Sequence, residues 1–376
     1  MLKRAVLLVL LLFSAFIINA FLNPIPQGEI VEGGKNSYGT SYSFEQAEWY
    51  GLDSRKAYLD LLDKFDFEWI RIPFFWDHPS THSTNSVQAI SGQSSSNFGN
   101  IDDLRWAVSE ANKRNVNVVI ALGAKTPYYP EFHLPENVAS QLSPDQNIDS
   151  NHAVGAEILE IDRRLVEALS HYENISHWQI ENEPFTPNEN GWTVDESLIK
   201  EEIGVVRNAD PIKRPIILSH VGPVVFDLRW KRLLKLLESG DVLGVNAYFK
   251  TQGASLFSFS LFENRISIPW PRGLSWPVQS WGLFSPDFAG IKKEAGKVGV
   301  DVWVLEMQAE PYIRDLNDGR KKEFSFDAED LKKGHNYLSS EKIKTIGFWG
   351  SPFWLFREGL GDFSWLNLVG EIVGRK

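Results

Sequence analysis

Two glutamates of this 376-residue chain each close a short apolar run. Glu183 ends the run that begins at His177, and Glu306 ends the run that begins at Asp301. A charge in such a place is costly unless it is paired or functional. Hydrolysis of a glycosidic bond needs two carboxyl groups: one gives a proton to the leaving oxygen, and the other attacks the sugar carbon or activates a water. Parallel barrel strands would bring both groups to one pocket.

The tripeptide Asn182-Glu183-Pro184 carries the sharper of the two signals. Three residues alone are weak, so the pattern depends on its context: it ends a predicted strand and leads into a polar loop. The alternative is that Glu183 caps the N terminus of a following helix. Glu181 competes for the chemical role. Because side chains alternate along a strand, we expect Glu181 to share the face of Glu183 but to lie deeper, as an interior or supporting carboxylate.

Arg71 and Tyr248 are the candidate partners of Glu306. Arg71 lies between two isoleucines in a predicted strand. There its guanidinium would hold a nucleophilic carboxylate ionised and oriented. Tyr248 ends another predicted strand and could donate its phenol proton to the same carboxylate. An ordinary buried tyrosine with a structural hydrogen bond is the alternative.

Strands and helices alternate from Tyr38 to the C terminus, a pattern typical of a parallel sheet with crossover helices. The spacing predicts strands at Tyr38–Phe44, Trp69–Trp76, Val116–Leu122, His177–Glu183, Pro215–Ser219, Val242–Tyr248, Asp301–Glu306 and Ile343–Trp349. It predicts helices near Asp53–Phe65, Leu104–Ala111, Ala153–Tyr172, Val194–Arg207, Leu228–Leu237, Pro286–Lys297, Asp327–Leu338 and Phe363–Val373. Eight strand–helix pairs predict a single (β/α)₈ barrel over residues 38–376. A doubly wound sheet is the alternative, but no Gly-rich phosphate loop follows a strand.

The long segment Lys250–Pro286, after the sixth strand, is rich in Trp and Phe and includes Trp281. Indole rings stack on the apolar faces of sugars, so this segment could supply sugar subsites. A hydrophobic flap on the barrel rim is an equal alternative, and membrane contact is a third. His220 ends the fifth strand, where it would either touch substrate or serve as a polar rim residue.

Composition excludes several classes of protein. The formal net charge is −11, with no cluster of Lys and Arg, which argues against nucleic-acid binding. Cysteine is absent, so disulfides and thiolate metal sites are excluded. The eight histidines are scattered, with no His-x-His on a strand and no pair at helical spacing beside a carboxylate; His78 and His82 are four apart but lie in a Ser/Thr-rich segment that does not have a helical pattern. We therefore expect no catalytic metal and no cofactor.

The N terminus has the pattern of an export signal. Lys3 and Arg4 precede an apolar run over residues 5–18, followed by Asn19-Ala20. Residues 1–20 are predicted to be a signal peptide or a membrane anchor, and residues 21–37 a spacer. If uncut, residues 5–22 are just long enough to span a bilayer. In either case we expect the barrel outside the cytoplasm, secreted or attached to the membrane.

The chain resembles clan A of the retaining glycoside hydrolases at a set of strand ends, namely Arg71, Asn182, Glu183, Tyr248, Glu306 and Trp349. The segment Phe67-Glu-Trp-Ile-Arg-Ile-Pro-Phe74 is similar to the second-strand signature of the cellulase-like family five. The resemblance implies that Glu183 is the general acid/base and Glu306 the nucleophile. It also implies that Asn182 bonds the sugar 2-hydroxyl and that Trp349 is the platform under the sugar.

Two positions differ from the usual residues of that family. The chain has Gly123-Ala-Lys125 where the family has a histidine after strand three, and Asn246-Ala-Tyr248 where it has His-x-Tyr. Both positions lie near the sugar. The expected activity is hydrolysis of a β-linked glucan, mannan or related poly- or oligosaccharide with retention, through carboxyl groups about 5–5.5 Å apart. A barrel that binds carbohydrate without cleaving it is the alternative.

Overall fold

The computed structural model describes residues 36–78, 98–221, 227–251, 255–261, 264–269, 276–277, 287–313, 315–321 and 326–376, together with residues 11, 12, 14, 25 and 28. From residue 251 to residue 277 the description is of the backbone alone. The predicted export segment lies almost wholly outside these residues, so its prediction stays untested. Within the described part of the chain, no helix combines the length and apolar character needed to cross a bilayer.

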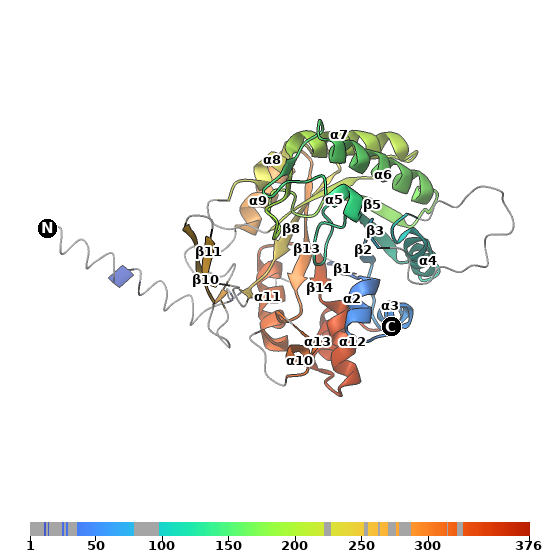
Figure 1. The fold of residues 1–376 in the computed structure, drawn as a ribbon. Helices are drawn as coiled ribbons and strands as arrows, with labels where there is room; N and C mark the ends of the chain where they lie inside the picture. Colours follow the sequence, from blue (N-terminus) through green and yellow to red (C-terminus); the bar gives the residue numbers. More distant parts are fainter. Residues whose placement is uncertain are drawn as a thin grey trace.

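A closed barrel of eight parallel strands forms the centre of the molecule, as predicted (Figure 1). The barrel strands are β1 (Ser37–Ser41), β2 (Trp69–Pro73), β3 (Asn117–Leu122), β5 (Ile175–Ile180), β7 (Ile216–His220), β8 (Val242–Ala247), β13 (Asp301–Gln308) and β14 (Thr345–Trp349). They follow one another around the barrel in chain order, and β1 closes the ring by pairing with both β14 and β2. Each strand therefore ends at the same face of the barrel.

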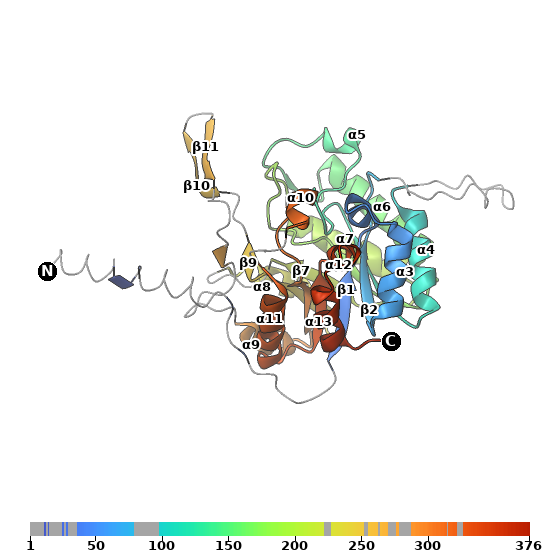
Figure 2. The ribbon, with the colours of Figure 1, turned by 90° about the horizontal axis from the view of Figure 1, so that it is seen from below.

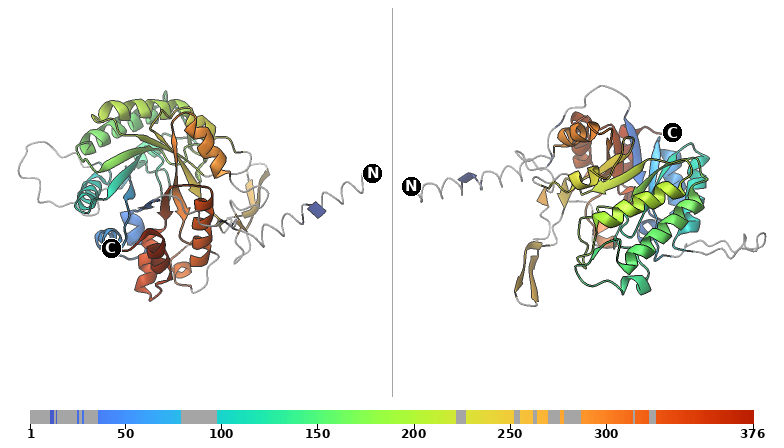
Figure 3. Two further views of the ribbon diagram at one scale, coloured as in Figure 1. Left: turned by 180° about the vertical axis from the view of Figure 1, so that it is seen from behind. Right: turned by 90° about the horizontal axis from the view of Figure 1, so that it is seen from above.

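Helices surround this barrel (Figure 3). The predicted helices correspond to α3 (Ser54–Lys64), α4 (Ile101–Asn112), α6 (Ala153–Leu169), α7 (Glu196–Ala209), α8 (Trp230–Leu234), α9 (Phe288–Gly296), α11 (Ala328–Ser340) and α13 (Ser364–Val373). The chain also forms α2 (Phe44–Trp49), α5 (Glu136–Ala139), α10 (Leu316–Gly319) and α12 (Ser351–Gly359), which the sequence did not predict. Figure 2 shows α5 and α10 at one end of the barrel and the C terminus at the other.

The described parts of the loops form short two-stranded sheets. They pair β4 (Asn147–Ile148) with β6 (Thr193–Val194), β9 (Lys250–Thr251) with β12 (Trp276–Pro277), and β10 (Ser255–Leu261) with β11 (Asn264–Pro269). The last two fall in the predicted aromatic segment, where β10 and β11 form an antiparallel ribbon that stands out from the barrel (Figure 2). Trp281 lies outside the described residues, so its proposed contact with sugar is not tested.

The first predicted strand was too long. Ser41 ends β1, and Phe44 already begins α2. The Ser43 side chain caps this helix by accepting a hydrogen bond of 3.1 Å from the backbone N–H of Gln46. A serine at this position favours helix initiation over a continuing strand. Phe44 is buried all the same, because it packs edge-on against Tyr42.

The lower interior of the barrel is filled by one apolar cluster, made of Trp69, Val119, Ile217, Val242 and Leu305. Trp69 needs unusual room, and two glycines on neighbouring strands supply it. A Cβ added at Gly39 would come within 2.1 Å of the Trp69 ring, and one at Gly347 within 2.5 Å of it. The indole of Trp69 therefore fits inside the closed barrel because residues 39 and 347 are glycines.

The same substitution should have opposite effects at two glycines. Gly347→Ala would press a methyl group against the Trp69 ring and the Leu305 carbonyl, each 2.5 Å from the new Cβ. We expect this to lower the free energy of unfolding by about 1–3 kcal/mol. Gly204→Ala in α7 meets no atom within 4 Å and should raise it by about 0.5–1 kcal/mol. Thermal denaturation followed by circular dichroism measures both; equal melting temperatures for Gly347→Ala and wild type would refute the tight fit.

Candidate active site

A pocket of about 380 Å³ opens at the carboxyl ends of the barrel strands. Its described lining consists of Tyr128, Tyr129, Glu131, Asn182, Glu183, Val221, Tyr248, Lys250, Glu306, Gln308, Glu310, Pro311, Tyr312 and Trp349. The two glutamates singled out in the sequence therefore face one cavity. No histidine is among these described lining residues, and the groups that they offer to an ion are oxygen atoms of carboxylates, amides and phenols.

Glu306 reaches the pocket through an irregularity in β13. Along this strand Val304 pairs with Val245 of β8, and Glu306 pairs with the next residue, Asn246, so Leu305 is an extra residue. Such a bulge re-aims the side chains that follow it. As a result Leu305 packs in the barrel interior while its neighbour Glu306 also turns inward to the pocket.

Both carboxylate oxygens of Glu306 accept short hydrogen bonds. Arg71 donates to Oε1 and the Tyr248 hydroxyl donates to Oε2, each at 2.6 Å. Glu306 and Arg71 are buried, with side-chain exposures of 4% and 0%. Burial, followed by the charge of Glu306, raises the pKa of Tyr248 well above its ordinary value, so the phenol keeps the proton that it donates. The predicted contacts of Arg71 and Tyr248 with Glu306 are both present.

The other two nitrogens of the Arg71 guanidinium also donate hydrogen bonds. Its Nε donates to the Ser41 hydroxyl at 2.8 Å, and Nη1 donates to the Gln179 side-chain oxygen at 3.1 Å. The Arg71 guanidinium also lies over the Trp349 ring at 5.8 Å. These contacts fix the orientation of the guanidinium relative to Glu306, because a planar group whose three nitrogens are all hydrogen-bonded has little freedom to rotate.

Glu183 lies in the loop that follows β5, three residues beyond the end of the strand. Its Oε1 accepts a hydrogen bond of 2.6 Å from the Asn246 amide, and its backbone N–H donates to the Ser219 hydroxyl at 3.0 Å. The fully buried Lys125 donates to the Glu183 carbonyl at 3.0 Å. Burial, followed by the nearby charge of Glu306, raises the pKa of Glu183 to about 7. Glu183 therefore keeps its proton until the pH approaches neutrality.

The expected alternation between Glu181 and Glu183 was wrong, whereas the buried, supporting position expected for Glu181 is confirmed. Strand β5 ends at Ile180, and both Glu181 and Glu183 have a left-handed backbone with φ of 50°. Regular alternation therefore stops before either residue. The Glu181 carboxylate accepts hydrogen bonds from the backbone N–H groups of Ala124 and Lys125, at 2.8 and 2.6 Å. It turns away from the pocket and ties the loop after β3 to the loop that carries Glu183.

Glu181 belongs to a chain of three buried carboxyl groups. The carboxyl group of Glu202 on α7 lies next to those of Glu181 and of Asp162 on α6, and all three residues are fully buried. Two carboxyl groups share a hydrogen bond only when one keeps its proton. Burial is the main cause that raises the pKa of Glu181 to about 7 and the pKa values of Asp162 and Glu202 well above their ordinary range. These three carboxyl groups therefore retain protons at pH values where ordinary carboxyl groups are ionised, and they lie behind the loop that carries Glu183.

The pocket also has an aromatic wall and further carboxyl groups, among them Glu310. Trp349 stacks on Tyr128, with ring centroids 4.2 Å apart and an angle of 28°. Glu310 lies four residues after Glu306 and accepts a hydrogen bond of 3.2 Å from the Tyr50 hydroxyl. Burial raises the pKa of Glu310 to about 7, against the opposing effect of hydrogen bonds that include one from Trp349. Sequence reasoning missed Glu310, although a second Glu before Pro311 just past a strand end was a visible signal.

The other predicted residues are placed as follows. The Asn182 side-chain oxygen accepts hydrogen bonds of 3.1 Å from Gln179 and from Ser219, and the residue lines the pocket. Asn246 contacts Glu183, as described. His220 is 1% exposed and is absent from the described lining, and its Nε2 lies 3.4 Å from an oxygen of Asp227. Burial lowers the pKa of His220 to about 4, so its ring is neutral.

Comparison with known proteins supports this architecture. The model of the Cellulase family (glycosyl hydrolase family 5) matches residues 28–236, more than half of the chain. Among solved structures, GH5_18 from Streptomyces cattleya in complex with GlcNAc aligns with a TM-score of 0.50 and 14% identity, over 84% of this chain and 70% of that chain. The hyperthermostable endo-1,4-beta-D-mannanase from Thermotoga petrophila RKU-1 with maltose and glycerol aligns with a TM-score of 0.47 and 13% identity, over 84% and 88%. No curated protein matches the sequence.

The buried carboxyl groups predict how stability varies with pH. Asp162, Glu181 and Glu202 keep protons in the folded chain at pH values where the unfolded chain, with ordinary pKa values near 4, has released them. The folded state therefore binds more protons, and stability should fall as pH rises above about 4, by roughly 1.4 kcal/mol per pH unit for each such proton.

Glu202→Gln tests this expectation, because glutamine stays neutral at every pH. We expect the fall in melting temperature between pH 5 and pH 8 to be smaller in Glu202→Gln than in wild type. Glu201→Gln changes the exposed neighbour on the same helix and should follow the wild-type profile. Parallel wild-type and Glu202→Gln profiles would mean that the cluster is not protonated.

Proposed function

The chain belongs to the cellulase family, glycosyl hydrolase family 5, and is a glycoside hydrolase; we propose that it cleaves β-linked glycans by double displacement. In this proposal Glu183 is the general acid/base and Glu306 the nucleophile. The observation that carries it is the contrast between two carboxyl groups of one pocket. Glu306 is bound by a guanidinium and a phenol, whereas burial and the charge of Glu306 raise the pKa of Glu183 to about 7. Carboxyl groups with divergent surroundings divide the acid and nucleophile roles.

In the first step the Glu306 carboxylate attacks the anomeric carbon while Glu183 gives its proton to the leaving oxygen. Arg71 and Tyr248 orient Glu306 for the attack, and their hydrogen bonds weaken as its charge passes to the new bond. Asn246 holds Oε1 of Glu183, which leaves Oε2 to carry the proton toward the substrate. The products are the leaving group, now with a free hydroxyl, and a glycosyl ester on Glu306.

In the second step a water attacks the glycosyl ester and Glu183, now a carboxylate, takes a proton from that water. The bond to Glu306 breaks, and the sugar leaves with the configuration that it had at the start. Loss of negative charge on Glu306 during the intermediate lowers the pKa of Glu183, because one of the causes that raise it is removed. The acid of the first step thereby becomes the base of the second.

The proposed substrates are glucans, mannans or related oligosaccharides with β-linkages. Trp349 and its stacking partner Tyr128 offer a flat apolar wall to a pyranose ring, and Asn182 lies beside them with its oxygen already bonded. The asparagine amide N–H₂ therefore remains to donate to a sugar hydroxyl such as the 2-hydroxyl. We also propose export of the barrel, on the basis of the basic and apolar N-terminal residues.

Substitution of each carboxyl group tests the pair. The purified protein should release sugar from at least one member of a panel of β-glucans, mannans, xylan and aryl β-glycosides. Glu183→Gln and Glu306→Gln should each lower kcat by at least about 10²- to 10⁴-fold, while Glu173→Gln, at an exposed site away from the pocket, should leave it unchanged. NMR of the first-formed product should show a retained anomeric configuration.

Other outcomes of this experiment would change the assignment. Full activity in either glutamine variant would remove that carboxylate from its role, and an inverted product would exclude the covalent intermediate. A folded protein that binds members of the panel without cleaving them would be a carbohydrate-binding barrel.

The pKa of Glu183 predicts the alkaline limb of the reaction. Since Glu183 must be protonated in the free enzyme, kcat/KM should fall tenfold per pH unit above about pH 7. A dinitrophenyl glycoside, whose leaving group needs little protonation, should show a much shallower fall over the same range. Steady-state rates from pH 5 to pH 9 measure both. Identical limbs for the two kinds of substrate would show that Glu183 does not protonate the leaving group.

A further inference from the structure

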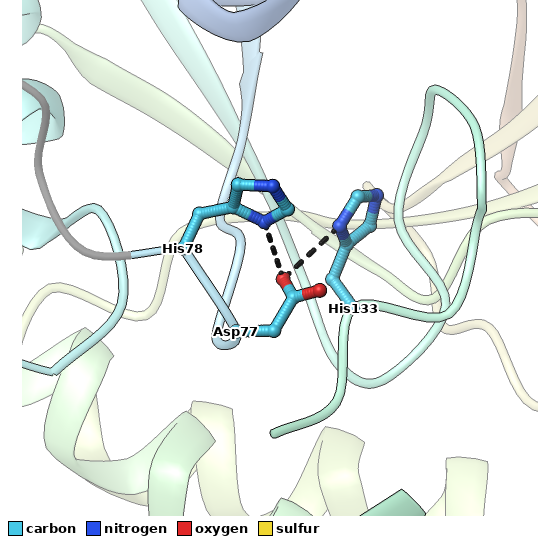
Figure 4. Close-up of side chains that lie close together, drawn as sticks. All are labelled: Asp77, His78 and His133. Atoms are coloured by element: carbon cyan, nitrogen blue, oxygen red, sulfur yellow. Dashed lines mark hydrogen bonds and ion pairs between the residues drawn. The ribbon is translucent and has the colours of Figure 1, made fainter. Parts of the chain in front are cut away.

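A second group of ligating side chains lies beside the pocket and takes no part in the proposed hydrolysis (Figure 4). Asp77 and His78 follow β2, and His133 lies in the loop that follows β3. One potential ligand atom from each of the three residues lies within 4.8 Å of the other two. Oδ1 of Asp77 is 2.7 Å from Nδ1 of His78 and 3.2 Å from Nδ1 of His133. Two imidazoles and a carboxylate thus converge on one point.

The surroundings of His133 constrain its protons. The ring is 2% exposed and stacks on Phe75, with centroids 3.8 Å apart. Its Nδ1 faces the Asp77 carboxylate, and its Nε2 lies 3.4 Å from the Tyr128 carbonyl oxygen. Both facing groups accept hydrogen bonds, but a neutral imidazole carries a single N–H. In the tautomer whose Nε2–H donates to the Tyr128 carbonyl, Nδ1 carries a lone pair. This lone pair faces an oxygen lone pair of Asp77 at 3.2 Å, and a cation bound between the two atoms would stabilise the arrangement.

We propose that Asp77, His78 and His133 bind a divalent transition-metal ion of the Zn²⁺ class. Two neutral imidazoles with one carboxylate suit Zn²⁺, and metal-bound histidines usually donate their other N–H to a backbone carbonyl, as Nε2 of His133 can to Tyr128. Bonds of about 2.0–2.1 Å in a tetrahedral site place ligand atoms roughly 3.3 Å apart. The separation of 3.2 Å already matches this value, and the one of 2.7 Å would have to widen by roughly half an ångström.

The site is open to solvent on one side. The side chains of His78 and Asp77 are 43% and 24% exposed, whereas that of His133 is buried. An ion can therefore enter without unfolding the barrel, and a water can take the fourth position. The protein contributes three ligands from two separate loops, so the bound ion would connect them.

The bound ion would fasten the loop after β2 to the loop after β3. Tyr128, whose carbonyl meets His133, stacks on Trp349 in the pocket. The metal would thus steady one wall of the pocket from outside, without touching the reacting atoms. A chain without cysteine has no disulfide to make such a connection. The alternative is a hydrogen-bonded cluster in which both imidazoles donate to Asp77 and no ion binds.

Metal binding can be measured without any turnover, so this test is independent of the proposed hydrolysis. The full chain, free of any histidine tag, is stripped with EDTA, dialysed and titrated with ZnCl₂ by isothermal calorimetry. We expect one Zn²⁺ per chain with micromolar affinity or tighter, and a melting temperature that rises when Zn²⁺ is added. Co²⁺ in place of Zn²⁺ should give the visible absorption of a low-coordinate site.

Variants separate the site from adventitious binding. His78→Gln alters a half-exposed ligand with little risk to folding and should weaken Zn²⁺ binding at least tenfold and abolish the thermal shift. Asp77→Asn should do the same, while His171→Gln, at an exposed histidine elsewhere, should behave as wild type. Equilibrium dialysis gives a direct count of bound Zn²⁺. The proposal would be overturned in favour of the hydrogen-bonded cluster if wild type retained no Zn²⁺, or if wild type, His78→Gln and Asp77→Asn retained equal amounts.

Discussion

The buried ion pair between Arg71 and Glu306 is the interaction on which the pocket depends. A guanidinium that is 0% exposed inside a barrel must have its donors satisfied, since an uncompensated buried charge costs about 3–5 kcal/mol. Ser41, Gln179 and Glu306 supply these acceptors from three different strands. The Glu306 carboxylate therefore has two roles: it neutralises the buried charge of Arg71, and it lines the pocket. The same contact fixes the position of the Glu306 carboxylate, whose charge in turn helps to raise the pKa of Glu183.

A second set of contacts holds Glu183 from behind. Glu181 accepts two backbone hydrogen bonds from the loop after β3, and Lys125 from that same loop donates to the Glu183 carbonyl. Two consecutive loops are thus bonded in both directions, which stabilises a left-handed backbone at Glu181 and Glu183 that would otherwise cost about 1 kcal/mol each. The position of the proposed acid therefore depends on residues that never reach the pocket, in addition to Asn246 and Ser219, which contact it directly.

The sequence was sufficient for the barrel and for the main partners of Glu306, because strand and helix periodicities are local and an arginine buried between two isoleucines requires an acidic partner. It failed where long-range contacts override a local pattern. Alternation placed Glu181 beside Glu183, but β5 ends earlier under hydrogen bonds from residues more than fifty positions away. The bulge at Leu305 is also invisible in the sequence, since it depends on pairing with β8. The sequence left two roles open for His220, substrate contact or a polar position on the rim. Its contact with Asp227 could not be predicted, because Asp227 lies in a loop and loops have no periodic pattern.

The indole of Trp69 has a consequence for how this barrel can evolve. Its ring occupies space that positions 39 and 347 leave free, so the three residues share one fixed volume on three adjacent strands. A larger residue at either glycine position is compatible with the closed ring only if residue 69 becomes smaller in the same lineage. Among descendants of this chain the side-chain volumes at these positions should therefore vary inversely. Divergence at the floor of the barrel would proceed by coupled exchanges, whereas the loops above it can change one residue at a time.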